Sequence, residues 1–182
     1  MDYFAYGSNL NKRAMATRCP GATPVGVATL ADFRFCFKRF ADIMPSVGAQ
    51  VVGALWEITP GGLRALDRFE GNDYGQIKVR VTCNGALIGA VAYAMKTQNA
   101  LAAPTLEYAR EIAMGYRDWG LDEALLRRAR YDTIKAHTPL EAEKPQHPDA
   151  PAPSRRRALW DPAQQSSGTL ESLTALKRPK PQ

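Results

Sequence analysis

The clearest alternation of apolar and polar residues lies in the middle of the chain and predicts a β-hairpin. Ile77, Val79 and Val81 alternate with charged or polar residues, which is the period of a strand with one buried face. Asn84-Gly85 follows, a pair that favours the two positive φ angles of a type I′ turn. Ala86–Met95 is therefore expected to return as the second strand of the hairpin.

Aromatic and β-branched residues predict further strands before this hairpin. Phe33, Phe35 and Phe37 alternate with Arg, Cys and Lys, so the segment Val25–Phe40 is expected to form one or two half-buried strands. Val51–Ile58 is a compact apolar run and predicts another strand.

A short helix is predicted to follow that strand. Thr59-Pro60 supplies an N-cap residue and then a proline at the first helical position. Apolar residues recur every three positions from Leu63 to Phe69, which predicts one stripe directed at the core. Gly71 is suited to ending the helix directly after Glu70, so this carboxylate is expected at a helix end beside packed surface.

The second half of the chain predicts two longer helices, Thr105–Trp119 and Asp122–Ala136, whose apolar faces are expected to pack against a sheet. Strands first and helices later indicate an α+β fold. A length of 182 residues favours a single well-packed core, and we expect this domain to comprise residues 1–137.

A change of composition after Thr138 predicts a disordered tail, residues 138–182, rich in proline, charge and small polar residues. Within it, Thr169–Leu176 could form a short helix that docks on a protein partner, with simple disorder as the alternative. The net charge is +6, but the densest basic run, Arg155–Arg157, lies in this tail with no aromatic nearby beyond Trp160. Nucleic acid is therefore not an expected partner, whereas a basic surface favours acidic small molecules.

The start of the chain and its cysteines and histidines exclude several classes. The first residues are strand-like and acidic, so neither a secretory signal nor a membrane span is predicted, and a cytoplasmic location is expected. The cysteines and histidines are few and show no paired ligand spacing: Cys19, Cys36, Cys83, His137 and His147. Reduced, buried thiols are expected rather than disulfides or a metal site.

The strongest candidate for chemistry is a loop almost at the first residue. The short apolar strand Tyr3–Tyr6 breaks into Gly7-Ser8-Asn9. Glycine reaches backbone angles closed to other residues, and serine and asparagine favour turns, so consecutive N–H groups can point at one anion. Small polar residues also end many strands, and a purely structural turn remains the alternative for this loop alone.

A second motif makes the pattern specific. Together, the segment Tyr3–Leu10 and the helix end Leu66–Gly71 resemble the gamma-glutamylcyclotransferase family, which includes the AIG2-like proteins. The resemblance covers roughly residues 2–137 and includes a helix start at Pro104–Tyr108. It implies a small mixed β-barrel-like sheet with helices packed outside.

The resemblance also implies an activity. In this family the α-amine of a gamma-glutamyl compound attacks the compound's own γ-carbonyl, which releases 5-oxoproline and an amine without a metal or cofactor. Glu70 matches the family's catalytic glutamate, which would carry the proton in both transfers. The matching substrate-binding loop is Tyr6, Gly7, Ser8, Asn9 and Leu10. Tyr74 and Tyr108 resemble tyrosines that line the family's cavity, with core packing as the alternative.

Some features leave alternatives open. Tyr74 is followed by Gly75-Gln76, where the family commonly has basic or bulky residues, so the leaving group could be an amino acid, an amine such as lysine, or a small metabolite. A non-catalytic member that binds a ligand or protein is the main alternative. A serine hydrolase that uses Ser8 lacks a base. Asp67 is expected to be a solvated residue on the turn before Glu70.

Overall fold

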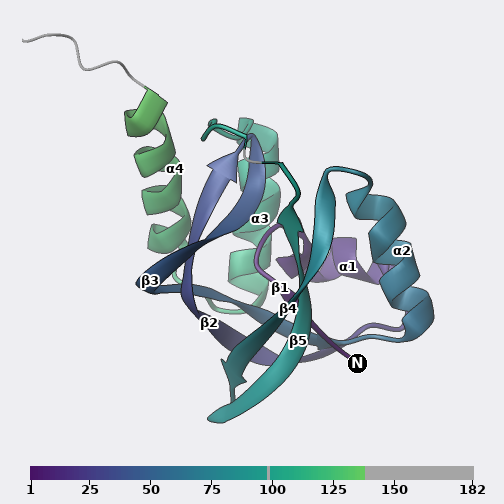
Figure 1. The fold of residues 1–182 in the computed structure, drawn as a ribbon. Coiled ribbons are helices and arrows are strands. Elements are labelled where there is room, and N and C mark those ends of the chain that lie inside the picture. Colours follow the sequence, from purple (N-terminus) through teal and green to yellow (C-terminus); the bar gives the residue numbers. More distant parts are fainter. Residues whose placement is uncertain (98, 138–182) are drawn as a thin grey trace, which may run out of the picture. The chain divides into compact units, whose positions relative to one another are not determined.

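The computed structural model describes residues 1–97 and 99–137, in which five strands close a barrel in the order β1-β3-β2-β4-β5 (Figure 1). The strands are β1 (Asp2–Ala5), β2 (Thr23–Lys38), β3 (Phe40–Glu57), β4 (Tyr74–Cys83) and β5 (Ala86–Met95). The helices are the 3-10 turn η1 (Ser8–Leu10), α1 (Lys12–Arg18), α2 (Pro60–Glu70), α3 (Leu106–Asp118) and α4 (Glu123–His137). The α-helices lie outside the barrel, which confirms the predicted fold class.

The barrel is closed by one parallel pair. Neighbouring strands are otherwise antiparallel, whereas β1 meets β5 in parallel at Tyr3 and Val91. The predicted hairpin of β4 and β5 is confirmed. Its turn residues Asn84 and Gly85 have φ of 51° and 77°, the positive values that a type I′ turn requires.

The predicted ends of α2 are also confirmed. The side chain of Thr59 accepts a hydrogen bond from the N–H of Gly62 at 3.0 Å, as an N-cap does. Gly71 ends the helix after Glu70 with a φ of 64°, which favours glycine. The predicted apolar stripe is only partly right, because Phe69 is 48% exposed and lies beneath the guanidinium of Arg18, 4.0 Å from its ring centre.

The strands β2 and β3 differ from their prediction. They form one long hairpin, so the predicted strand Val51–Ile58 is the end of a strand that begins at Phe40. The predicted alternation of buried phenylalanines with exposed residues also fails near the turn. Lys38, which was expected on the exposed face, is buried as Phe37 is. Its ammonium lies 2.8 Å from the carboxylate of Asp42, which is the only described ion pair with both side chains nearly inaccessible. Charge pairing thus allows a buried lysine at this end of β2, where the main chain pairs with Ala102.

The helix α1 was not predicted, because it spans only two turns and buries one side chain, that of Met15. Its start is nevertheless encoded locally. The side chain of Asn11 accepts a hydrogen bond from the N–H of Ala14 at 3.1 Å, so Asn11 caps the helix. The helix turns the chain back so that its last residue, Arg18, faces the loop from which it started.

Close packing of β1 on β3 requires a glycine. A Cβ atom at Gly53 would overlap the carbonyl oxygen of Ala5 and lie 2.8 Å from the ring of Phe4. We expect Gly53→Ala to lower the free energy of unfolding by about 1–3 kcal/mol, as overpacking does. Denaturant unfolding of this variant and of Gly89→Ala gives the comparison, since a Cβ at Gly89 meets nothing within 4 Å. Equal losses in the two strand variants would contradict the steric explanation.

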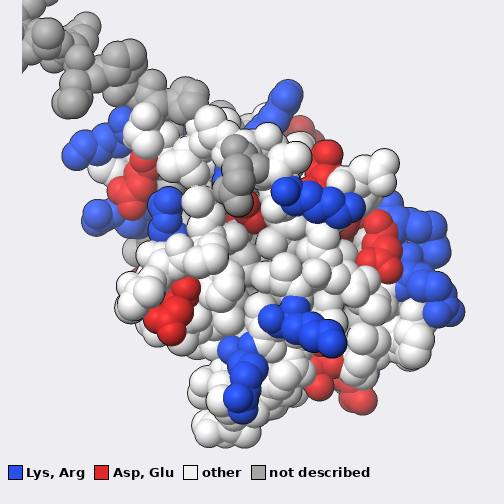
Figure 2. All heavy atoms as spheres, in the orientation of Figure 1, with Lys and Arg blue, Asp and Glu red and all other residues white. Residues whose placement is uncertain are grey.

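The predicted tail, including Thr169–Leu176, lies outside the described residues. Among the residues that are described, no helix is long and apolar enough to cross a membrane. Figure 2 shows lysine and arginine side chains interspersed with acidic ones on one face of the described domain.

Candidate active site

The loop after β1 approaches its neighbours closely. A Cβ atom at Gly7 would lie 3.0 Å from the Cβ of Ala41, so a side chain here would press on the start of β3. The next residues form η1, whose first hydrogen bond runs from the N–H of Leu10 to the carbonyl of Gly7 at 3.0 Å. The N–H groups of Gly7, Ser8 and Asn9 precede that bond and have no partner inside the turn. The predicted role of these N–H groups as donors to an anion stays a prediction.

Two adjoining cavities lie beside this loop. The outer one has a volume of about 340 Å³ and the inner one about 30 Å³. Four residues line both: Ser8, Glu70, Tyr74 and Tyr108. The outer cavity adds Arg18, Phe40, Phe69, Asp73 and Glu111, and the inner one adds Tyr3, Tyr6, Gly7, Asn9 and Ala41. The structure therefore brings the predicted glutamate, loop and tyrosines to one place.

Glu70 is held at the junction by a single amide. Its Oε1 accepts a hydrogen bond from Nδ2 of Asn9 at 2.9 Å. Burial raises the pKa of the Glu70 carboxyl above its ordinary value, against smaller lowering effects from the Asn9 hydrogen bond and the charge of Arg18. A carboxyl group in this setting exchanges a proton closer to neutral pH than an exposed one does.

The side chain of Asn9 has three partners and is 4% exposed. Besides Glu70, its Nδ2 donates to the hydroxyl of Tyr3 at 2.8 Å, and its Oδ1 accepts from Nη1 of Arg18 at 2.9 Å. The sequence predicts Asn9 as a substrate-binding residue, but the structure turns its side chain towards Glu70.

The tyrosines are anchored to main-chain atoms at the cavity wall. Tyr74 donates to the carbonyl of Ala41 at 2.7 Å, and the N–H of Ala41 donates to the hydroxyl of Tyr108 at 3.3 Å. Tyr6 donates to the carbonyl of Tyr93 at 2.6 Å. Burial raises the pKa of Tyr6, Tyr74 and Tyr108, so these hydroxyls stay neutral at physiological pH.

Leu10 lies apart from the cavities, although the sequence places it in the substrate-binding loop. Its side chain is fully buried, and its carbonyl accepts a hydrogen bond from the indole of Trp119 at 2.8 Å. A Cβ atom at Gly115 of α3 would lie 2.5 Å from the Cβ of Leu10. Leu10 thus holds the loop against α3 and lines neither cavity.

The expectation that Asp67 is a solvated residue is only partly right, because the residue is half-buried and hydrogen-bonded. Its Oδ1 accepts hydrogen bonds from the hydroxyl of Tyr93 at 2.7 Å and from Nε2 of Gln76 at 2.6 Å. The carboxylate therefore ties the end of α2 to β4 and β5. This contact fixes the helix turn that carries Glu70.

The sequence reasoning missed several residues that line the cavities, among them Tyr3, Arg18 and Glu111. Glu111 could have been found, because it follows Tyr108 by three residues and so shares its face of the helix. Arg18 gave no such signal, since the helix that presents it was not predicted.

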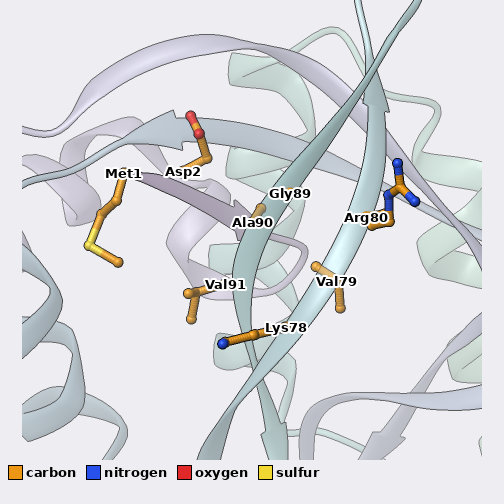
Figure 3. Close-up of a pocket in the computed structure, with 8 residues that line it drawn as sticks. All are labelled: Met1, Asp2, Lys78, Val79, Arg80, Gly89, Ala90 and Val91. Carbon is orange, nitrogen blue, oxygen red and sulfur yellow. The ribbon is translucent and has the colours of Figure 1, made fainter.

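A larger cavity, of about 420 Å³, lies on the barrel wall (Figure 3). It is formed by Met1 and Asp2 with Lys78–Arg80 of β4 and Gly89–Val91 of β5. None of the residues bonded to Glu70 lines it, so size alone does not identify the functional site. In the part of the chain that the structure describes, no group of three or more histidine, cysteine or acidic residues could hold a metal ion.

Comparisons with known proteins identify the family of the chain. The family model "Gamma-glutamyl cyclotransferase, AIG2-like" matches residues 3–119. The chain is 34% identical over 137 residues to a gamma-glutamylcyclotransferase of Mus musculus, covering 66% of this chain and 72% of the relative. It is 35% identical over 135 residues to the Homo sapiens protein of the same name, covering 65% and 71%. A solved gamma-glutamyl cyclotransferase structure superposes with a TM-score of 0.65 at 31% identity, covering 71% of this chain and 86% of that one.

Proposed function

Because the chain belongs to the gamma-glutamyl cyclotransferase, AIG2-like family, we propose that it cleaves a gamma-glutamyl compound and releases 5-oxoproline and an amine. The observation that carries this proposal is the placement of Glu70. Its partly buried carboxyl lines the same inner cavity as Gly7, Ser8 and Asn9, whose N–H groups we assign as the donors. A proton carrier and donors for an oxyanion are the two functions that this reaction needs from a protein.

In the proposed reaction Glu70 carries protons, one at a time, from the attacking to the leaving nitrogen. The carboxylate takes a proton from the substrate's α-ammonium, and the freed amine forms a bond to the γ-carbon. The γ-oxygen becomes an oxyanion that the loop N–H groups stabilise. The tetrahedral intermediate then expels the amide nitrogen, which receives the first proton from Glu70. The ring nitrogen gives up its second proton, which Glu70 passes to the departing amine, so that a neutral lactam and an ammonium are formed. No water or enzyme nucleophile enters the product.

Orientation of the substrate supplies much of the rate. An amine held against its own γ-carbonyl reacts intramolecularly, and correct alignment can recover about 7–11 kcal/mol of the barrier. Tyr6, Tyr74 and Tyr108 would fix the bent chain, because their rings line the cavities and their hydroxyls are anchored. The candidate substrates are gamma-glutamyl amino acids, gamma-glutamyl amines and small metabolites that carry a gamma-glutamyl group.

A hydrolase based on Ser8 is not supported by the geometry. Its Oγ accepts a hydrogen bond from Nη1 of Arg18 at 3.0 Å, and a guanidinium cannot act as a base. Among the described residues that line the two cavities there is no histidine. A non-catalytic, ligand-binding role is the remaining alternative.

Incubation with a panel of gamma-glutamyl compounds tests the proposal. We expect 5-oxoproline and the free amine to appear in equal amounts from at least one member of the panel. Binding of a gamma-glutamyl compound without product would favour the non-catalytic alternative.

The pH dependence of turnover should reveal the burial of Glu70. The carboxyl must be ionised to accept the first proton, and its pKa lies above the ordinary value of 4.5 because it is desolvated. We therefore expect the acid limb of kcat/KM to fall at a pH above 4.5, and to be lost in Glu70→Gln. Initial rates over pH 4 to 8 measure it; a limb at or below 4.5 would argue against Glu70 as the base.

A further inference from the structure

We propose that Arg18 is a positioning residue for the reaction assigned above. Anchored by Glu111, its guanidinium holds the amide of Asn9 in one orientation, so that Nδ2 of Asn9 stays on Oε1 of Glu70. The second oxygen, Oε2, is then the one that exchanges protons with a substrate. This inference rests on the proposed function for its catalytic consequence, but its structural part can be tested without turnover.

The hydrogen bonds of Arg18 fix which way the amide of Asn9 points. Nη1 of Arg18 lies 2.9 Å from Oδ1 of Asn9 and 3.0 Å from Oγ of Ser8. A guanidinium only donates hydrogen bonds, so the atom of Asn9 that faces it must be the carbonyl oxygen. The NH₂ group then points the other way, to the hydroxyl of Tyr3 and to Glu70.

The reversed amide would be unfavourable on both sides. The carbonyl oxygen of Asn9 would face a carboxylate oxygen of Glu70, and its NH₂ would face the guanidinium of Arg18. Two acceptors and two donors would oppose each other, and buried groups left without partners are costly. Arg18 therefore specifies the donor that Glu70 receives.

Arg18 is itself fixed from two directions. Its Nη2 lies 2.5 Å from Oε1 of Glu111 on α3, and both side chains are mostly buried, 16% and 28% exposed. The guanidinium also stacks over the ring of Phe69, the residue before Glu70. The chain of contacts thus joins α3, α1 and the loop to the end of α2.

Arg18 supplies the positive charge near the Glu70 carboxyl. Five tyrosines surround the carboxyl, each with a raised pKa and so neutral at working pH: Tyr3, Tyr6, Tyr74, Tyr93 and Tyr108. The acidic groups that face the outer cavity with it are Asp73 and Glu111. Of the described residues that line either cavity, Arg18 is the only cation.

Removing Arg18 should therefore change two measurable properties of the site. Loss of the cation should raise the pKa of Glu70, and loss of the donor should free the amide of Asn9 to turn. The matched variants separate these effects. Arg18→Met keeps the apolar stem of the side chain and removes both the positive charge and the hydrogen-bond donors. Arg18→Lys keeps the charge but lacks the planar set of donors of a guanidinium. Arg13→Met, an exposed arginine of the same helix, is the control.

The decisive readout is NMR titration of the full chain with ¹³C-labelled glutamate and ¹⁵N-labelled asparagine, with Glu70→Gln and Asn9→Ala to assign the signals. We expect Arg18→Met to raise the midpoint of Glu70 by about one pH unit and to speed exchange of the Asn9 amide protons. Arg18→Lys should speed that exchange with a smaller shift of the midpoint. Arg13→Met should match the parent.

Kinetics then link the position to the reaction. In Arg18→Met the acid limb of kcat/KM should move up with the Glu70 midpoint, and kcat should fall about 10–100-fold with KM nearly unchanged. A parental titration and parental amide exchange in Arg18→Met would overturn the proposal, as would a raised KM with unchanged kcat, which marks a substrate-binding arginine. If Arg18→Met does not fold, Arg18→Lys decides by the same readouts. If the unsubstituted protein shows no turnover, the proposed function is refuted. The NMR titration and amide exchange then still test the structural role of Arg18.

Discussion

Replacement of Glu70 by glutamine is expected to slow the formation of 5-oxoproline by about 10²–10⁴-fold, the usual range for loss of a general acid–base group. Glutamine keeps the size of the side chain and an oxygen that can accept the hydrogen bond from Nδ2 of Asn9. It cannot carry a proton between the two nitrogens. Binding of a gamma-glutamyl ligand by the loop should persist, and turnover, binding and unfolding should be measured on the same preparation.

The same variant should be no less stable than the parent at neutral pH. Because the folded protein raises the pKa of Glu70, the proton favours the folded state. The contribution of Glu70 to stability is therefore fully present below its ordinary pKa of 4.5 and is lost as the pH rises through the raised value. Glutamine has no charge to bury, so Glu70→Gln should lose this pH dependence.

A matched carboxylate is needed as the control for Glu70→Gln. Asp67 is unsuitable, because its bonds to Tyr93 and Gln76 position the end of α2. Glu57, exposed at the end of β3, is suitable, and Glu57→Gln should leave turnover unchanged. Near-parental turnover in Glu70→Gln would refute the mechanism, and an unfolded Glu70→Gln would mean that the residue is structural.

Removal of the Asp42 carboxylate is expected to cost about 3–5 kcal/mol of stability, the typical effect of breaking a buried ion pair. Its two oxygens have different partners, Nζ of Lys38 at 2.8 Å and the N–H of Met95 at 3.0 Å. Asp42→Ala leaves a buried ammonium and a partly buried N–H without these acceptors. Such a loss is a large part of the stability of an ordinary domain.

Two further variants separate the charge from the hydrogen bond. Asp42→Asn keeps an acceptor for Met95 and should lose less stability than Asp42→Ala. The double variant Lys38→Met/Asp42→Asn removes the unpaired charge as well and should recover part of the loss. Urea unfolding measures all three; a loss below about 1 kcal/mol in Asp42→Ala would contradict the account of the buried pair.

Turn and helix-cap residues in the sequence predicted the β4–β5 hairpin and the helix α2. The turn at Asn84-Gly85 needs two positive φ angles, and the helix before Gly71 needs a cap at each end, so their boundaries could be predicted closely. The long hairpin of β2 and β3 could not be. Its middle contains Pro45 and Gly48, which usually interrupt strands, and its pairing depends on contacts far apart along the chain.

The site was predicted in its parts and not in its connections. Glu70 and the loop Gly7-Ser8-Asn9 were identified from motifs, and the structure brings them together. Asn9 donates to Glu70 and accepts from Arg18 only in one orientation of its amide. That orientation is specified by residues that the fold brings together. Periodicity carries no information about such side-chain networks.

The most direct test of the central claim is to follow the oxygen and the amine during cleavage in H₂¹⁸O. If the α-amine of the substrate is the nucleophile, the product is 5-oxoproline without solvent oxygen, and the same compound with its α-amine acetylated is not cleaved. A parallel incubation without protein corrects for spontaneous cyclisation. Glutamate that contains ¹⁸O, or cleavage of the acetylated compound, would show attack by water or by the protein and would contradict the proposed cyclisation at Glu70.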